Sequence, residues 1–245
     1  KNKIRKNSIQ NFSKKLIFKE CISLKNINYS YEGSNFYLKD INLKIYKGEK
    51  IGIMGETGCG KSTLQDILIG LLKPTSGEFF IDNIKFDHDN LKFMSAWYSL
   101  ISHVPQSIFI SDDTLENNIC IKDIGSKNYE KLNKVAKISL ISNFIESLSN
   151  GYKTKLGENG ILISGGQKQR IGIARALYKD PSIIFFDEAT SALDIKTESE
   201  LIKNIDCLEN KPTIIMIAHR LKTLENCDRV FEIKNGELKK VKLKY

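Results

Sequence analysis

The segment from Gly55 to Thr63 constrains the fold of this chain more than any other, because it has the spacing of a phosphate-binding loop. Its sequence, Gly-Glu-Thr-Gly-Cys-Gly-Lys-Ser-Thr, fits the pattern G-x-x-x-x-G-K-[S/T]. A short apolar strand is expected just before it, over 50–54, and an apolar helix just after it, over 64–72. Glycines let such a loop curl so that backbone N–H groups point at an anion, and the helix N-terminus adds positive potential. The segment therefore predicts a nucleotide-binding α/β domain.

Two side chains of this loop have distinct expected roles. Lys61 supplies a point charge for the β- and γ-phosphates, and Ser62 supplies a hydroxyl for Mg²⁺. We expect ATP to contact the whole loop, which comprises Gly55, Glu56, Thr57, Gly58, Cys59, Gly60, Lys61, Ser62 and Thr63.

A second chemical feature is a pair of carboxylates after an apolar run. Ser182 to Phe186 predicts a buried strand, and Asp187 and Glu188 follow it directly. Open α/β sheets bind ligands at the carboxyl ends of their strands. We expect Asp187 to hold Mg²⁺ and Glu188 to orient or deprotonate the attacking water. The alternative for this pair alone is helix capping by two acids.

The wider pattern of apolar residues predicts the fold class. Apolar β-rich runs at 182–186 and 213–218 alternate with helical stretches at 165–179 and 195–208, which is typical of a parallel α/β sheet. Partly alternating segments predict half-buried antiparallel strands, and three- and four-residue spacing predicts helices. The strands are expected at Leu16 to Ile22, 41–45 and 77–82, and the helices at about 127–150.

A second anion site is indicated at Ile163-Ser164-Gly165-Gly166-Gln167. Ser164 is a good N-cap, and the two glycines would expose N–H groups ahead of a helix. An ordinary serine-capped helix explains the cap but not two glycines followed by glutamine.

Together these motifs resemble the nucleotide-binding domain of ATP-binding cassette (ABC) transporters, over about residues 16–240. The segment 163–167 is close to the L-S-G-G-Q signature of that family. The resemblance implies a P-loop NTPase (RecA-like) core, an antiparallel β subdomain and an inserted α-helical subdomain at about 107–170. It also implies that two copies sandwich two ATP molecules head to tail. Ser164, Gly165, Gly166 and Gln167 of one copy would then close on the ATP of the other.

The remaining family positions follow in order. Tyr31 matches the aromatic residue that stacks on adenine, although Tyr29 is an alternative. Gln106 resembles the glutamine that touches Mg²⁺ or the water. Asp194, in Ser191-Ala192-Leu193-Asp194, resembles the loop that crosses the dimer interface, and His219 resembles the switch histidine at the γ-phosphate.

Three features are similar to the exporter branch of the family. Ala-Thr follows Glu188, Arg-Leu follows His219, and Lys155 to Gly160 resembles the x-x-G-E-x-G segment, with Asn159 where arginine is more usual. The segments 102–109 and 48–78 also look similar to bacterial flippases of lipid-linked oligosaccharides. This resemblance implies an ATP hydrolase that powers an exporter or flippase, with a transmembrane domain and a second, identical cassette as partners.

Charge and composition bear on location. The 245 residues carry a net charge of +9, but residues 1–19 hold seven Lys or Arg with no acid and residues 239–245 hold four Lys. Between them, 27 basic residues face 29 acidic ones, so the body is nearly neutral and no nucleic-acid site is expected. We expect residues 1–15 to be a basic linker from a membrane domain and 241–245 to be a basic tail.

The linker's cations would lie near anionic lipid on the cytoplasmic face of a bacterial inner or plasma membrane. The chain starts at Lys1 without Met, has no signal peptide or 20-residue apolar run, and is expected to be part of a longer polypeptide or a trimmed piece. Five cysteines without metal-binding spacing indicate reduced thiols.

Two other classes of function were weighed. A soluble ABC protein that acts on ribosomes or nucleic acid would carry the same phosphate motifs, but generally has two cassettes or a long coiled-coil insertion. A nonhydrolytic nucleotide-binding scaffold is disfavoured because every catalytic position is filled. The expected cofactors are ATP and Mg²⁺.

Overall fold

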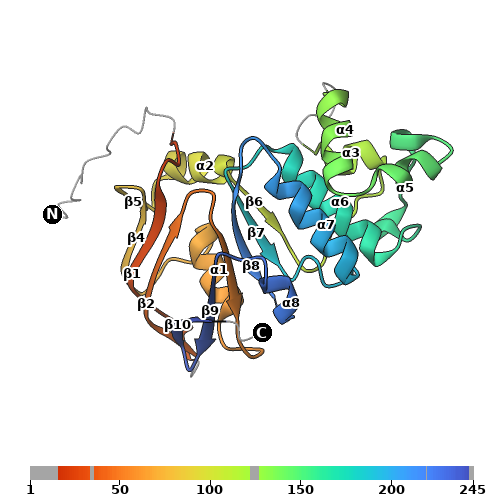
Figure 1. The fold of residues 1–245 in the computed structure, drawn as a ribbon. Helices are drawn as coiled ribbons and strands as arrows, with labels where there is room; N and C mark the ends of the chain where they lie inside the picture. Colours follow the sequence, from red (N-terminus) through yellow and green to blue (C-terminus); the bar gives the residue numbers. More distant parts are fainter. Residues whose placement is uncertain (1–15, 34–35, 122–126, 219, 243–245) are drawn as a thin grey trace.

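The computed structural model describes residues 16–33, 36–121, 127–218 and 220–242. An antiparallel sheet occupies one side of the molecule, with the strand order β2-β1-β4-β5 (Figure 1). Its strands are β1 Cys21–Ser30, β2 Tyr37–Tyr46, β4 Ser76–Ile81 and β5 Ile84–Lys85.

The second sheet has six strands in the order β10-β9-β3-β8-β7-β6, and it is parallel except for the β9–β10 hairpin. Its strands are β3 Lys50–Met54, β6 Ile101–Val104, β7 Ile183–Asp187, β8 Thr213–Ile217, β9 Arg229–Lys234 and β10 Glu237–Val241. This arrangement agrees with the expected parallel α/β sheet accompanied by antiparallel strands.

The helices pack on the second sheet or extend from it, with α3, α4 and α5 gathered on the side opposite the antiparallel strands (Figure 1). They are α1 Lys61–Ile69, α2 Leu91–Leu100, α3 Leu115–Ile119, α4 Tyr129–Ile138, α5 Ser142–Ser147, α6 Gly165–Tyr178, α7 Ile195–Asp206 and α8 Leu221–Leu224. Two short 3₁₀ turns cover Gly151–Lys153 and Glu158–Gly160. None of the helices in the described ranges has the length and apolar character needed to cross a membrane.

Alternate residues of β7 belong to different hydrophobic cores. Ile183 and Phe185 pack in the core that includes α1 and the antiparallel sheet, whereas Ile184 and Phe186 pack in the core that includes α6 and α7. All four side chains are 1% exposed or less. A strand buried on both faces must be apolar at every position, which explains why the sequence of β7 does not alternate.

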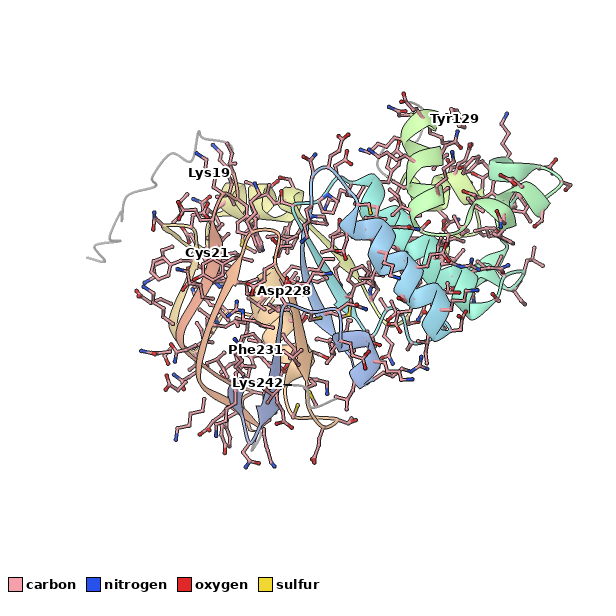
Figure 2. The ribbon with its side chains drawn as sticks, in the orientation of Figure 1. Lys19, Cys21, Tyr129, Asp228, Phe231 and Lys242 are labelled. Atoms are coloured by element: carbon pink, nitrogen blue, oxygen red, sulfur yellow. The ribbon has the colours of Figure 1, made fainter. Side chains whose placement is uncertain are left out.

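The start of β1 differs from the expected strand at Leu16 to Ile22, because regular pairing begins only at Cys21. Leu16 and Phe18 are buried, but the amides of Lys19, Glu20 and Cys21 donate to the carboxylate of Asp82 at 2.8 to 2.9 Å. That carboxylate takes the place of a neighbouring strand. Lys19 and Cys21 therefore lie on the side of the antiparallel sheet, far from Tyr129 of α4 (Figure 2).

The C-terminal end differs from expectation by one residue. Val241 belongs to β10 and pairs with Val230, although we expected the tail to begin at 241. The expected linker at 1–15 lies outside the described residues.

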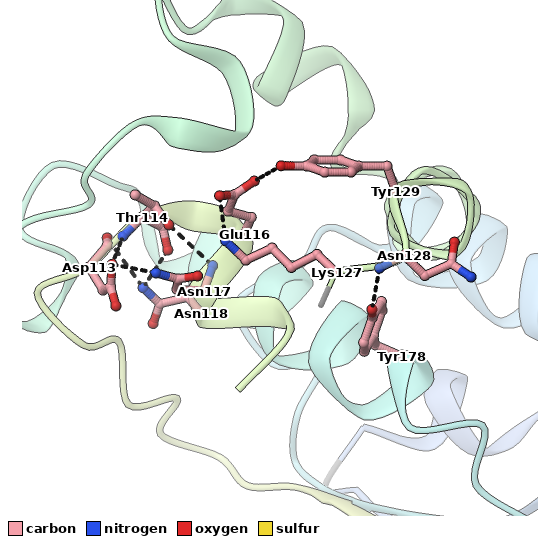
Figure 3. Close-up of polar contacts among 9 residues, drawn as sticks. All are labelled: Asp113, Thr114, Glu116, Asn117, Asn118, Lys127, Asn128, Tyr129 and Tyr178. Atoms are coloured by element: carbon pink, nitrogen blue, oxygen red, sulfur yellow. Dashed lines mark hydrogen bonds and ion pairs between the residues drawn. The ribbon is translucent and has the colours of Figure 1, made fainter. Parts of the chain in front are cut away.

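Deep in the helical region, Glu116 of α3 is a buried carboxylate with two partners (Figure 3). It accepts hydrogen bonds from Lys127 Nζ at 2.5 Å and from the hydroxyl of Tyr129 at 3.0 Å. The side chains of Glu116 and Lys127 are only 7% and 15% exposed. The pair joins α3 to the start of α4 across the intervening segment.

Candidate functional site

The phosphate loop has a backbone that few residues other than glycine can adopt. Gly55 has φ of +147° and Gly60 has φ of +109°. A Cβ atom at Gly55 would lie 2.6 Å from the carbonyl oxygen of Ile233, and one at Gly60 would lie 2.7 Å from Leu38. At Gly55 and Gly60, conformation and space therefore both favour glycine.

Helix α1 begins directly after this loop and leaves its first turn uncapped by a side chain. Its N-cap is Gly60, which has no side-chain oxygen to accept a hydrogen bond from the first amides. Orphan N–H groups at a helix N-terminus need an acceptor, and an anion supplies one.

Lys61 brings a buried ammonium to the same loop. It is 6% exposed, and its Nζ donates to the carbonyls of Gly55 and Glu56 at 2.9 and 2.8 Å. An ammonium has three donors, so one remains. Within the described ranges no carboxylate lies in ion-pair distance of Lys61. A buried cation without a counter-ion favours an anionic ligand.

Asp187 and Glu188 lie where β7 ends, as predicted. Burial raises the pKa of Asp187, while His103 and Lys61 oppose the shift and Glu188 adds to it. The amide of Glu188 donates to Ile217 of β8 at 3.0 Å, which fixes the backbone at the sheet edge. The capping alternative does not hold, because Asp194 is the N-cap of the next helix, α7.

Glu188 has φ of +49°, a left-handed conformation that is uncommon for a residue with a side chain. Its carboxylate accepts a hydrogen bond from Gln106 Nε2 at 3.0 Å. Such strained residues cluster at functional sites because the surrounding structure must hold them in place. The structure thus brings Gln106 and Glu188 together, although they are 82 positions apart.

The segment at 163–167 forms the predicted capped helix start. Ser164 Oγ accepts from the amide of Gln167 at 3.2 Å, and Gln167 Oε1 accepts from the amide of Ser164 at 2.7 Å, which is a capping box. Gly165 and Gly166 face Ala192, and a Cβ atom at Gly166 would lie 3.3 Å from the Ala192 carbonyl. The signature segment therefore lies against the loop at 191–194.

Gln169 of α6 holds that loop in place, a role that the sequence did not reveal. Its Oε1 accepts from the amide of Ala192 at 2.9 Å, and its Nε2 donates to Ser191 Oγ at 3.2 Å. Asp194 then caps α7 by accepting from the amide and the hydroxyl of Thr197 at 3.0 and 2.6 Å.

The aromatic candidates lie beside the phosphate loop. The hydroxyl of Tyr31 is 3.3 Å from Thr63 Oγ1, and the residue is 43% exposed. Tyr29 packs edge-on against Tyr31 with ring centroids 5.0 Å apart, and it is more buried. The accessible ring next to the loop is therefore Tyr31. His219 lies outside the described residues.

Two polar residues in this region were not expected from the sequence. Gln65, four residues after Lys61, is 1% exposed, and its Nε2 lies 3.1 Å from Nε2 of His103 on β6. The sequence signal for a role of Gln65 was a polar residue within the otherwise largely apolar α1. The sequence gives no sign that His103 is its partner, because only the fold brings β6 next to α1.

The geometry agrees with what the chain resembles among known proteins. The family model described as "ABC transporter" matches residues 38–191. The chain belongs to the ABC transporter family.

Curated relatives extend this result. The chain is 38% identical over 219 residues to "Iron-sulfur clusters transporter ATM1, mitochondrial" of Gibberella zeae, a match that covers 89% of this chain and 31% of that protein. It is 40% identical over 220 residues to "ATP-dependent lipid A-core flippase" of Wigglesworthia glossinidia brevipalpis, with 89% and 37% covered. The chain thus spans about a third of the length of these relatives.

A solved structure described as a bacterial Atm1-family ABC exporter with ATP bound has the same fold. The TM-score is 0.83 and the identity is 32%, and the match covers 91% of this chain and 38% of that one. The fold is therefore that of an ABC ATPase domain, and ATP is the nucleotide that this family binds.

The residues present fit Mg²⁺ as well as ATP. The hydroxyl of Ser62, the side-chain carbonyl of Gln106 and the carboxylate of Asp187 are oxygen ligands, which Mg²⁺ prefers. The desolvation that raises the pKa of Asp187 would be relieved by a cation next to its carboxylate.

Proposed function

We propose that this chain is the ATP-hydrolysing domain that powers an exporter or flippase. The observation that carries the proposal is the arrangement of two groups: the buried Lys61, which has no carboxylate in ion-pair distance among the residues that the structure describes, and the Asp187–Glu188 edge. Transporters and a flippase among the relatives favour this function over a role on ribosomes or nucleic acid.

In this proposal the phosphates of ATP lie in the loop from Gly55 to Thr63. The uncapped amides of α1 and the free donor of Lys61 hold them, and Tyr31 stacks on adenine. Ser62, Gln106 and Asp187 hold Mg²⁺, which when bound neutralises charge on the β- and γ-phosphates.

Glu188 orients and deprotonates the water that attacks the γ-phosphate. Its left-handed backbone and the hydrogen bond from Gln106 define where the carboxylate points. His219, which follows β8 in the sequence, would contact the γ-phosphate.

Hydrolysis requires a second, identical cassette in this proposal. The signature residues Ser164, Gly165, Gly166 and Gln167 carry a helix N-terminus, and they belong to α6 rather than to the loop that binds ATP. Next to them, Ile161 and Leu162 are 80% and 72% exposed. Pairing head to tail would cover these side chains and place the signature of one copy, with Asp194, at the ATP of the other.

A transmembrane domain is the other proposed partner. The exporter and flippase relatives support a location at a membrane, and we place the domain on the cytoplasmic face of a bacterial inner or plasma membrane. Closure on ATP and reopening after hydrolysis would then drive the transport cycle.

The test is the substitution Glu188→Gln. ATP binding should persist, because the phosphate loop is untouched, whereas hydrolysis should fall by about 10² or more as the base is lost. Phosphate release and calorimetric ATP binding measure the two quantities. Glu200→Gln, at an exposed position of α7, is the control and should leave both unchanged. Normal turnover in Glu188→Gln would reject the assigned base.

A further inference from the structure

Gln65 of α1 and His103 of β6 form a polar pair of which Gln65 is the buried member and His103 is exposed. Gln65 is 1% exposed, and its Nε2 lies 3.1 Å from Nε2 of His103. Its Oε1 is buried and has no hydrogen-bond partner within the described part of the chain. A buried amide in an otherwise apolar interface costs free energy, so its retention favours a functional reason.

The sheet register places His103 beside the metal carboxylate. His103 on β6 pairs with Phe185 on β7, and Phe185 faces the core that contains α1. Side chains alternate along a strand, so Asp187, two residues later, faces the same side as Phe185. His103 and Asp187 are thus diagonal neighbours on one face.

The helix presents a matching face. Residues four apart lie on the same side of a helix, which puts Gln65 below Lys61 on α1. Lys61 and Gln65 on the helix therefore oppose Asp187 and His103 on the strands. The two helix residues are buried, Asp187 is half-buried and His103 is exposed, so the four line the edge of the core rather than its interior.

We propose that His103, held by Gln65, is a positioning residue that supports Asp187 as a ligand of Mg²⁺. The proposal rests on the proposed ATPase function and deepens it. Neither residue touches the reacting atoms; Gln65 fixes the ring, and the ring fixes the environment of the carboxylate.

The electrostatics agree with this role. Partial desolvation lowers the pKa of His103, and the carboxylates of Asp187 and Asp66 oppose that shift. In turn, His103 counters the burial that raises the pKa of Asp187 and of Asp66. The Gln65 amide can donate or accept, so it can hold either ring tautomer.

The experiment measures ATP binding by calorimetry in a Glu188→Gln background, first in EDTA and then over a Mg²⁺ titration. The double variant Gln65→Leu with His103→Leu replaces the polar pair by an apolar one of similar size. ATP affinity in EDTA should stay unchanged, while the Mg²⁺ concentration for half-maximal tightening of binding should rise about tenfold, as expected when the support of a metal ligand is removed.

Two further variants make the test specific. His103→Gln keeps a hydrogen-bonding group for Gln65 and should recover part of the Mg²⁺ response. His88→Leu removes a partly buried histidine whose ring packs at a tilted angle against Phe86, and it should leave the response unchanged.

Folding is checked by circular dichroism. If the double variant does not fold, the volume-conserving Gln65→Met removes only the amide and should raise the Mg²⁺ requirement in the same direction. An unaltered Mg²⁺ titration in a folded variant that lacks the pair overturns the inference. Absence of ATP binding in the parent would instead contradict the proposed function.

Discussion

At the scale of single residues, the phosphate loop depends on space as much as on charge. Gly55 and Gly58 both have positive φ, +147° and +80°, but their surroundings differ. A Cβ atom at Gly55 would meet backbone at 2.6 Å, whereas one at Gly58 would have nothing within 4 Å. Close approach to backbone can be relieved only by moving the loop.

Gly55→Ala should therefore abolish most ATP binding and destabilise the chain by about 2 to 3 kcal/mol, from strain and overpacking together. Gly58→Ala is the matched variant and should cost about 1 kcal/mol, since only backbone strain is added. Denaturant unfolding and calorimetric ATP binding measure both effects. Equal losses of stability in Gly55→Ala and Gly58→Ala would show that the close approach of Gly55 to the Ile233 backbone does not matter.

The cysteines differ in the reactivity expected from their environments. Burial, with Asp228 and Asp206 nearby, raises the pKa of Cys227 to about 12, while Cys207 is exposed. A raised pKa keeps the thiol protonated, and the thiolate is the reactive form. Iodoacetamide at pH 8 should label Cys207 and leave Cys227 unlabelled until the chain is unfolded, as mass spectrometry can follow. Comparable labelling rates of Cys207 and Cys227 in the folded chain would contradict the burial of Cys227.

At the scale of elements, the Glu116–Lys127 pair fastens α3 to α4 (Figure 3). Glu116→Ala leaves an ammonium largely buried without its partner. The free energy of unfolding should drop by about 2 to 3 kcal/mol, less than for a fully buried pair because Lys127 keeps some exposure. Glu130→Ala, exposed on α4, should change it by less than about 0.5 kcal/mol. Denaturant titration measures the free energy of unfolding of both variants. Similar losses in the two would show that the Glu116–Lys127 pair does not stabilise the fold.

Elements defined by a local signal could be predicted from the sequence. β3, β7, α6 and α7 follow from apolar runs, helical spacing and caps, which act within a few residues. β6 could not be predicted, because Ser102 and His103 interrupt its apolar pattern and only pairing with β7 defines it as a strand. Long-range pairing carries no signature in a single short segment.

The same distinction applies to the candidate site. The loop around Lys61 and the carboxylates at 187–188 were identified from spacing, and the structure places them at one edge of the sheet. The partner of Gln65 could not be foreseen, since it lies 38 positions away and is brought near by the fold. The Asp194 cap is different, because it acts on Thr197 only three residues on and is a local signal. The expected strand from Leu16 was wrong because the Asp82 carboxylate, not a strand, satisfies the amides at 19–21.

At the scale of the whole molecule, the proposed ATP site is shared between two copies of the domain. The phosphate loop and the signature belong to different helices, α1 and α6, and the proposed head-to-tail dimer completes each site with the other copy. Such an interface should form only when ATP bridges it.

Light scattering on the Glu188→Gln chain should therefore report a monomer without nucleotide and about twice that mass with ATP and Mg²⁺. Lys61→Ala in the same background should stay monomeric because it removes the cation that holds the phosphates. A dimer of equal abundance without nucleotide would show that ATP does not bridge the interface.

The three hydrogen bonds from the amides of residues 19–21 to Asp82 determine how the domain responds to a force applied at its N-terminal side. A pull on the chain ahead of Leu16 first loads the buried side chains of Leu16 and Phe18 and then this carboxylate, before it can unzip the ladder of β1. Three hydrogen bonds loaded together resist force better than bonds that break one at a time. Tension from that direction would thus be delivered to the Asp82 turn after β4, and through β4 to the antiparallel sheet as a unit.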